Sequence, residues 1–434
     1  MSKLHSPQFS IVFVEYIKNS RDVLAYDSYL CVGVKFYPTT TNDDECGKVI
    51  AELRVTNGGQ LVQSNGMQLT MDMLMKKVAR TIATSIACLK EKSKVLVICA
   101  LHNRMLAEYI VLESYALKAY PYLWVFDEKL FLRYARSFSD EAIATLPEHV
   151  CSLIRNSDVI IWLSQFDDIG KLPANVEEAI ISFWDSVDVE IRTKPCLSVN
   201  LLSPRCIEEL GLNYEKHLRA FAKAVNVDYS RLRRVGDSLA RSLCGAKLVH
   251  VYDKKGTDLT FHIDKRRVGI EVGTLEDCFS SGKECEVDVP SGEVYVAPIE
   301  TSANGVLAVE EFRGYSIQNL ILRFKEGKII DFKAEKGYDV FRGLLDKAEG
   351  DKDRIAEFGI GINYGMSRTG YRIYDEKALG TAHIAIGNNV HLGGENKASI
   401  HLDFVLYKPS IEADNVLIMK RGMLQNVSER GQRK

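Results

Sequence analysis

Three short runs in the last quarter of the chain decide its architecture: Ala356-Glu-Phe-Gly-Ile-Gly-Ile-Asn363, Thr381-Ala-His-Ile-Ala-Ile-Gly387 and Ser399-Ile-His-Leu-Asp-Phe-Val405. In each run, apolar residues alternate with polar or small ones, which is the period of a β-strand with one buried face. In the third run this alternation places His401 and Asp403 together on one face and the apolar residues on the other. The sequence therefore predicts strands that present imidazole and carboxylate groups from the same side.

Glutamates occupy the polar face of two such runs. Glu357 shares its face with Gly359 and Gly361, and Glu293 opens a further alternating run, Pro290-Ser-Gly-Glu-Val-Tyr-Val-Ala297. We expect the glycines to leave room for an ion or a substrate backbone beside the carboxylate. Nitrogen and oxygen ligands without thiolates predict a site for zinc, cobalt, manganese or iron. The alternative is that each histidine is a hydrogen-bonded structural residue, but five such groups together favour the metal site.

Four motifs carry a family resemblance: Pro290-x-Gly-Glu-Val-Tyr-x-Ala-Pro298, the run 356–363, Asp375-Glu-Lys-x-x-Gly-Thr-x-His-Ile-Ala-Ile-Gly387, and His401-Leu-Asp403. They are similar to motifs of the M29 metallopeptidases, the aminopeptidase T and leucyl aminopeptidase family, and the resemblance extends over about residues 75–410. It implies a homodimer with a dinuclear metal centre. It implies five metal ligands: Glu293, Glu357, His383, His401 and Asp403. Glu376 matches an acidic position that serves as a further ligand or as a base.

One position departs from the family pattern. The peptidases carry a tyrosine seven residues after the first ligand histidine, where it stabilises the developing oxyanion, and this chain has Val390 there. Loss of an oxyanion donor typically costs on the order of a hundredfold in turnover. His391 is one candidate replacement, and the other candidates are Tyr364, Tyr371 and Tyr374.

Three functions are consistent with these residues. The first is an aminopeptidase-like hydrolase that removes N-terminal residues from small peptides or cleaves aminoacyl amides. In it, two zinc, cobalt or manganese ions bridged by Glu357 lower the pKa of bound water, and Glu376 transfers a proton to the leaving amine. The second is a mononuclear iron(II) dioxygenase that opens dihydroxypyridine rings, with His383, His401 and Asp403 as a two-histidine, one-carboxylate set. The missing tyrosine favours the dioxygenase, and the retained glutamates count against it. The third is a non-catalytic metal-binding protein.

The overall composition is typical of a soluble globular protein, with 46% hydrophobic and 26% charged residues and a net charge of −2. This balance gives no indication of nucleic-acid binding. There is no run of eighteen apolar residues, so we expect no membrane-spanning helix, and the apolar run 9–14 is too short for a signal peptide. The ten cysteines include no Cys-x-x-Cys pair, and we expect reduced thiols in a cytoplasmic protein.

A chain of 434 residues predicts two or three domains. Residues 1–72 are interpreted as an α+β extension with strands at 8–14 and 30–36. Its role stays open between a cap over the substrate site, an oligomer contact and a segment without function.

The remaining chain changes character twice. Residues 73–244 alternate helices with apolar strands and predict a Rossmann-like α/β domain with a parallel sheet, whose last strand is expected at 198–202. No glycine-rich nucleotide-binding motif follows these strands. Residues 245–434 predict a strand-rich α+β domain that holds the metal site, with hairpins at 247–263 and 320–333.

Overall fold

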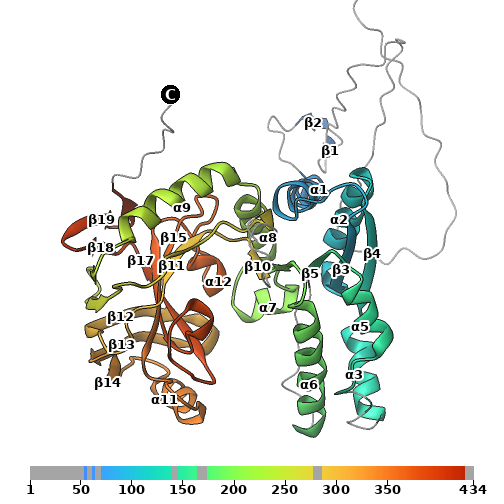
Figure 1. Ribbon diagram of the computed structural model, residues 1–434. Coiled ribbons are helices and arrows are strands. Elements are labelled where there is room, and N and C mark those ends of the chain that lie inside the picture. Colours follow the sequence, from blue (N-terminus) through green and yellow to red (C-terminus); the bar gives the residue numbers. More distant parts are fainter. Residues whose placement is uncertain are drawn as a thin grey trace, which may run out of the picture. The chain divides into compact units, whose positions relative to one another are not determined.

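The computed structural model describes residues 53–55, 61–63, 70–138, 142, 144–163, 174–276 and 286–425 (Figure 1). The chain divides into two compact units, Met1–Thr70 and Met71–Lys434. In the first unit, β1 (Leu53–Val55) and β2 (Leu61–Gln63) form an antiparallel pair. The strands expected at 8–14 and 30–36 lie outside the described residues. All elements named below belong to the second unit.

A five-stranded parallel sheet has the order β10-β6-β5-β3-β4. Its strands are β3 (Lys94–Ala100), β4 (Tyr120–Phe126), β5 (Val159–Leu163), β6 (Cys196–Val199) and β10 (Glu286–Val289). Strand β3 lies between β5 and β4, and every residue from Val95 to Ala100 is buried. Its uninterrupted apolar run is that of a parallel strand covered on both faces.

Helices provide that cover. In chain order they are α1 (Met71–Thr81), continued by the π-helical residues Ile82–Ile86, α2 (Arg104–Ala116), α3 (Glu128–Ser137), α5 (Glu148–Arg155), α6 (Ala174–Ile191), α7 (Pro204–Glu209) and α8 (Tyr214–Val225). On one face Val97 packs with residues of α1, α2 and α8, and on the other Leu96 and Ile98 pack with residues of α5 and α6. The predicted α/β class of this region is confirmed.

The outer strand of the parallel sheet comes from an unexpected part of the chain. Residues 198–202 do not form the last strand, because β10 pairs in parallel with β6 beyond it, with Glu286 beside Cys196 and Val289 beside Val199. Only residues 290–292 separate β10 from the next strand, which begins at Glu293. The parallel sheet is therefore joined directly to the sheet that carries the predicted ligands.

The C-terminal region is built from two antiparallel sheets. The smaller has the order β17-β16-β15-β11-β9, formed by β9 (Gly269–Glu271), β11 (Glu293–Val296), β15 (Ile355–Gly361), β16 (Thr381–Gly387) and β17 (His401–Tyr407). The larger has the order β14-β13-β12-β8-β7-β18-β19-β20, formed by β7 (Leu248–Tyr252), β8 (Asp258–His262), β12 (Asn304–Phe312), β13 (Ile317–Lys325), β14 (Lys328–Lys333), β18 (Ser410–Ala413), β19 (Val416–Lys420) and β20 (Met423–Leu424). The two predicted hairpins are confirmed as β7–β8 and β13–β14.

A hydrophobic core lies between these two sheets. Phe358 of β15 packs on Phe261 of β8 with ring centroids 5.2 Å apart, and Phe404 of β17 packs on Phe312 of β12 at 5.3 Å. Helices α9 (Tyr229–Leu243) and α11 (Tyr338–Lys347) contribute further residues to the core. Since one face of the smaller sheet is buried in this core, its polar residues all lie on the opposite face. Within the described residues, no helix is long and apolar enough to cross a membrane.

Candidate metal centre

The predicted ligands lie on one face of the five-stranded sheet. Side chains alternate between the two faces along β15, β16 and β17. Phe358, Ile384 and Phe404 point into the core, and the residues next to each of them in the same strand point to the other face. Neighbouring strands are in matching register, with Gly359 opposite His383. The structure thus brings together the five residues that the sequence singled out: Glu293, Glu357, His383, His401 and Asp403.

The glycines on this face have a different role from the one expected. A Cβ atom on Gly359 would lie 2.1 Å from Cε1 of His383, and one on Gly361 would lie 2.2 Å from the carbonyl oxygen of Ala378. The expectation of open room for an ion or a substrate was wrong, because the imidazole ring and the backbone near Ala378 fill that space. Gly359 instead lets the ring of His383 pack directly against the backbone of the neighbouring strand.

Glu357 is the centre of the group. Its Oε1 lies 3.5 Å from Nε2 of His383, and its Oε2 lies 3.1 Å from Nε2 of His401. Nε2 of His401 is also 3.1 Å from Oδ1 of Asp403, and Nε2 of His383 is 3.7 Å from Oε2 of Glu293. One ligand atom from each of Glu357, His383 and Asp403 lies within 4.8 Å of the others. The two carboxylate oxygens of Glu357 therefore face two different imidazoles.

The two histidine rings are held in different ways. Nδ1 of His401 lies 2.7 Å from the carbonyl oxygen of Asn388, and because a carbonyl only accepts, Nδ1 must carry the proton. In the neutral ring, Nε2 then holds a lone pair directed at Glu357 and Asp403, which is the tautomer that a metal ligand requires. Within the described part of the chain, the buried Nδ1 of His383 has no hydrogen-bond partner. Packing against Gly359 holds this ring instead.

The electrostatics of the group favour positive charge. Burial opposes ionisation of Glu357, but hydrogen bonds from His383 and His401 outweigh it and hold the pKa of Glu357 at about 2. Burial also opposes protonation of both rings, yet the facing carboxylates raise the pKa of His383 to about 9 and that of His401 to about 11. The pKa of Asp403 is likewise lowered, against burial, by the hydrogen bond with His401 and by Arg372. Buried carboxylates in this arrangement require cations, and a divalent ion held by such ligands displaces protons.

The other residues proposed from the sequence lie around this group. Glu376 is buried and follows α12 (Arg372–Asp375); its Oε2 accepts a 2.9 Å hydrogen bond from Nη1 of Arg372, which also donates to Asp403. His391 is exposed in the short 3-10 helix Val390–Leu392, and its ring centroid lies 5.5 Å from that of His401. Val390 is 48% exposed.

Two of the three tyrosines considered as replacements for Val390 are engaged elsewhere. The hydroxyl of the buried Tyr374 donates to the carbonyl oxygen of Asn200 at 2.6 Å. The hydroxyl of Tyr364 accepts from the backbone N–H of Asp228 at 2.6 Å. The ring of His391, another proposed replacement, lies beside the ring of the predicted ligand His401.

Sequence reasoning missed the two cations of the site, Arg372 and Lys377. Arg372 connects Glu376 to Asp403, and Lys377 is buried within contact distance of Glu293. The available signal was their position, because Lys377 stands in the motif that contains Glu376. Tyr295 was also missed, although alternation along β11 places it on the same face as Glu293. Burial and the nearby carboxylates raise the pKa of Tyr295 to about 12.

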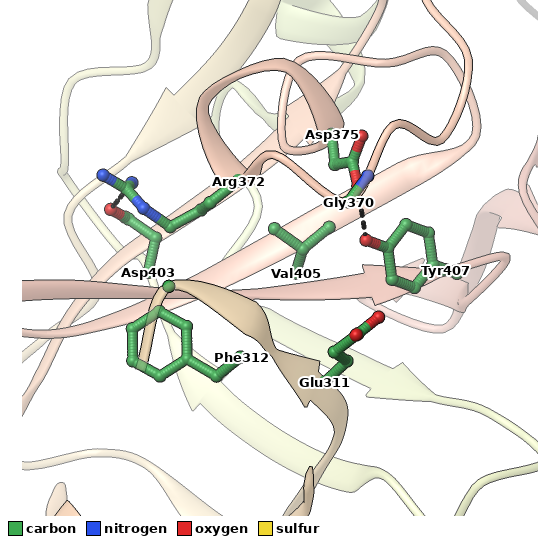
Figure 2. A pocket seen from close by; sticks show the side chains of 9 residues that line it. Glu311, Phe312, Gly370, Arg372, Asp375, Asp403, Val405 and Tyr407 are labelled. Atoms are coloured by element: carbon green, nitrogen blue, oxygen red, sulfur yellow. Dashed lines mark hydrogen bonds and ion pairs between the residues drawn. The ribbon is translucent and has the colours of Figure 1, made fainter. Parts of the chain in front are cut away.

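A small pocket continues from the group along β17 (Figure 2). At one end Arg372 donates to Asp403, and at the other the hydroxyl of Tyr407 donates to Asp375 at 2.7 Å. Its volume of about 20 Å³ is enough for roughly one water molecule. The pocket therefore offers space for a solvent molecule beside Asp403.

Known proteins with similar sequences are metalloproteases and aminopeptidases. Residues 230–432 match the family model described as thermophilic metalloprotease (M29). Aminopeptidase AmpS of Bacillus subtilis (strain 168) is 27% identical over 187 residues, which cover 38% of this chain and 44% of that protein. The match thus spans less than half of the length of this relative.

Two solved structures have a similar fold. Wild-type AmpT from Thermus thermophilus has a TM-score of 0.61 at 18% identity, covering 82% of this chain and 100% of that one. The 2,5-dihydroxypyridine dioxygenase of Pseudomonas putida KT2440 has a TM-score of 0.58 at 15% identity, covering 83% of this chain and 99% of that one. At these identities the likeness shows the fold. The segment that matches the thermophilic metalloprotease (M29) family model, residues 230–432, contains all five residues gathered on the sheet face.

Proposed function

We propose that this chain is a metal-dependent aminopeptidase-like hydrolase that removes N-terminal residues from small peptides or cleaves aminoacyl amides. The observation that carries the proposal is the convergence of two imidazoles and three carboxylates on one sheet face within the M29 segment. The relative AmpS is named an aminopeptidase, which supports the same class of reaction.

The residues present fit a divalent metal. They offer nitrogen and oxygen ligands without thiolate, a set that suits zinc, cobalt or manganese. The tautomer of His401 is fixed by the carbonyl of Asn388, as expected for a metal ligand. We propose two ions, because each oxygen of Glu357 faces a different histidine: His383 and Glu293 would complete one side, and His401 and Asp403 the other.

When bound, such ions supply a Lewis acid and make a coordinated water acidic enough to react near neutral pH. The chain's own residues supply the remaining functions. The Glu376 carboxylate, held in place by Arg372, would receive a proton and deliver it to the leaving amine. The exposed ring of His391, beside His401, would donate a hydrogen bond to the substrate carbonyl from the turn that also contains Val390.

The proposal includes the setting of the enzyme. We propose a cytoplasmic homodimer that acts on small peptide or aminoacyl substrates and binds neither membranes nor nucleic acid. The family resemblance supports the homodimer, and the net charge of −2 gives no support for a nucleic-acid partner.

Metal content and peptidase activity test the proposal together. Protein purified without chelator is analysed for metal per chain and assayed with leucine p-nitroanilide and leucinamide, beside a His401→Ala variant. We expect about two zinc, cobalt or manganese ions and hydrolysis, both lost in the variant. One iron per chain with oxygen-dependent opening of a dihydroxypyridine ring would replace the proposal by the dioxygenase. A metal-free, inactive protein under all loading conditions would leave a non-catalytic role.

A further inference from the structure

A buried ammonium group lies at the edge of the metal centre. The side chain of Lys377 is 4% exposed, and its Nζ lies within 4 Å of four carboxylates. The distances are 2.9 Å to Glu293, 3.4 Å to Asp288, 3.8 Å to Glu271 and 3.9 Å to Glu376. Lysine is almost never fully buried unless it is paired, so this position must depend on the carboxylates around it.

The four carboxylates differ in what else holds them. Glu271 accepts from the hydroxyl of Ser291 at 2.8 Å, and Asp288 accepts from the side-chain amide of Asn200 at 2.9 Å. Glu293 makes the shortest contact with Lys377, through Oε1, while its Oε2 is directed at Nε2 of His383. One oxygen of Glu293 is thus fixed by the lysine, and the other faces the metal centre.

We propose that Lys377 is a positioning residue that orients Glu293 as a metal ligand through one oxygen; this inference rests on the proposed metal-dependent function. Ligand carboxylates are generally held by a second group, and removal of that group typically weakens metal binding about 10- to 100-fold. Lys377 also joins three segments, because Asp288 belongs to β10, Glu293 to β11, and Lys377 itself follows α12. Its loss would free the Glu293 side chain to turn away from His383.

Orientation and charge make opposite predictions for metal affinity. A positive charge 2.9 Å from one ligand oxygen repels a cation, so if charge were its main effect, removing Lys377 would tighten metal binding. If Lys377 acts mainly by orienting Glu293, removing Lys377 weakens metal binding. A second substitution, Glu271→Gln, restores the local charge without touching a proposed ligand. The two effects can therefore be separated.

The experiment measures zinc and manganese affinity of metal-free protein by calorimetric titration. We expect Lys377→Met to bind about 10- to 100-fold more weakly than the wild type. Lys377→Arg, which can still donate to Glu293, should recover most of this loss. The double variant Lys377→Met/Glu271→Gln should fold at least as well as the single variant and still bind weakly. Lys352→Met, which removes a lysine that donates to the carbonyl of Ala348, serves as the matched control and should bind like the wild type.

Near-UV circular dichroism of each metal-free variant establishes that it is folded. If Lys377→Met does not fold, the double and the arginine variants still decide the question, because they keep the charge balance. Wild-type affinity or tighter binding in Lys377→Met, or a return to wild-type affinity in the double variant, would overturn the proposal. A wild-type protein that binds neither metal would instead refute the proposed function, and the role of Lys377 with it.

Discussion

Replacement of Gly359 by alanine tests whether the proposed metal centre depends on the close contact between β15 and the ring of His383. The added Cβ would lie 2.1 Å from Cε1 and 2.3 Å from Nε2 of that ring. Carbon atoms pack at roughly 3.5–4.0 Å, so the ring would have to retreat by about 1.5 Å. The Nε2 atom that now lies 3.5 Å from Glu357 would be carried away with it.

The cost of this movement has two parts. Forcing an extra methyl group into a packed site typically destabilises a protein by about 1–3 kcal/mol. A displacement of that size also exceeds the tolerance of a metal site, in which ligand atoms must be placed to within about 0.5 Å. We therefore expect the free energy of unfolding from urea titration to fall by about 1–3 kcal/mol, and metal affinity from calorimetry to fall at least tenfold.

Gly343→Ala is the matched control. It makes the same substitution within α11, where a Cβ would meet no heavy atom within 4 Å. Alanine favours a helix interior over glycine by up to about 1 kcal/mol, so this variant should be as stable as the wild type or more so, with unchanged metal binding. If Gly359→Ala matched the wild type in both measurements, the assigned role of the glycine would be wrong.

Three further variants probe other parts of the second unit. Burial lowers the pKa of His217 to about 4, so the folded state favours the neutral ring, and stability is lost as the pH falls from about 6.5 towards 4. Between these two pH values the free energy of unfolding, measured by urea titration, should fall by up to about 3 kcal/mol less for His217→Gln than for the wild type. An equal fall in both proteins would show that His217 does not cause this pH dependence. His391→Ala should lower kcat about a hundredfold with unchanged metal content, whereas an unchanged kcat would exclude an oxyanion role. A fragment of residues 246–434 should aggregate or lack cooperative unfolding, because β10 then loses its pairing with β6. A monomeric fragment that binds metal would show that this region folds without the parallel sheet.

The sequence was sufficient for local features of the site. Period-2 alternation assigned His401 and Asp403 to one strand face, and the same pattern placed Glu357 correctly, because the opposite face must enter the core. Both hairpins were likewise determined by short-range signals. Such features depend on a few neighbouring residues, and the sequence states them directly.

Features that depend on distant pairing were not predictable. Strand β10 joins the parallel sheet through a ladder with β6, and the two segments are about ninety positions apart. Lys377 pairs with Glu293 across 84 positions, and no local sequence pattern around either residue indicates that the two are in contact. The role of Gly359 was misjudged for the same reason, because a glycine shows that space is needed but does not show which group takes it.

Other contacts between distant parts of the chain indicate that the geometry of the site also depends on residues outside the segment that matches the family model. The hydroxyl of Tyr374, two residues before Glu376, donates to the carbonyl of Asn200 at the end of the parallel sheet. The side chain of Asn363, just beyond β15, donates to the carbonyl of Ala224 in α8 and to that of Ser291 between β10 and β11. These bonds are buried, so breaking them would leave polar groups without partners at a cost of about 1–3 kcal/mol each. The parallel sheet and α8 therefore hold the end of β15 and helix α12, and changes there should reach the proposed metal centre through Asn363 and Tyr374.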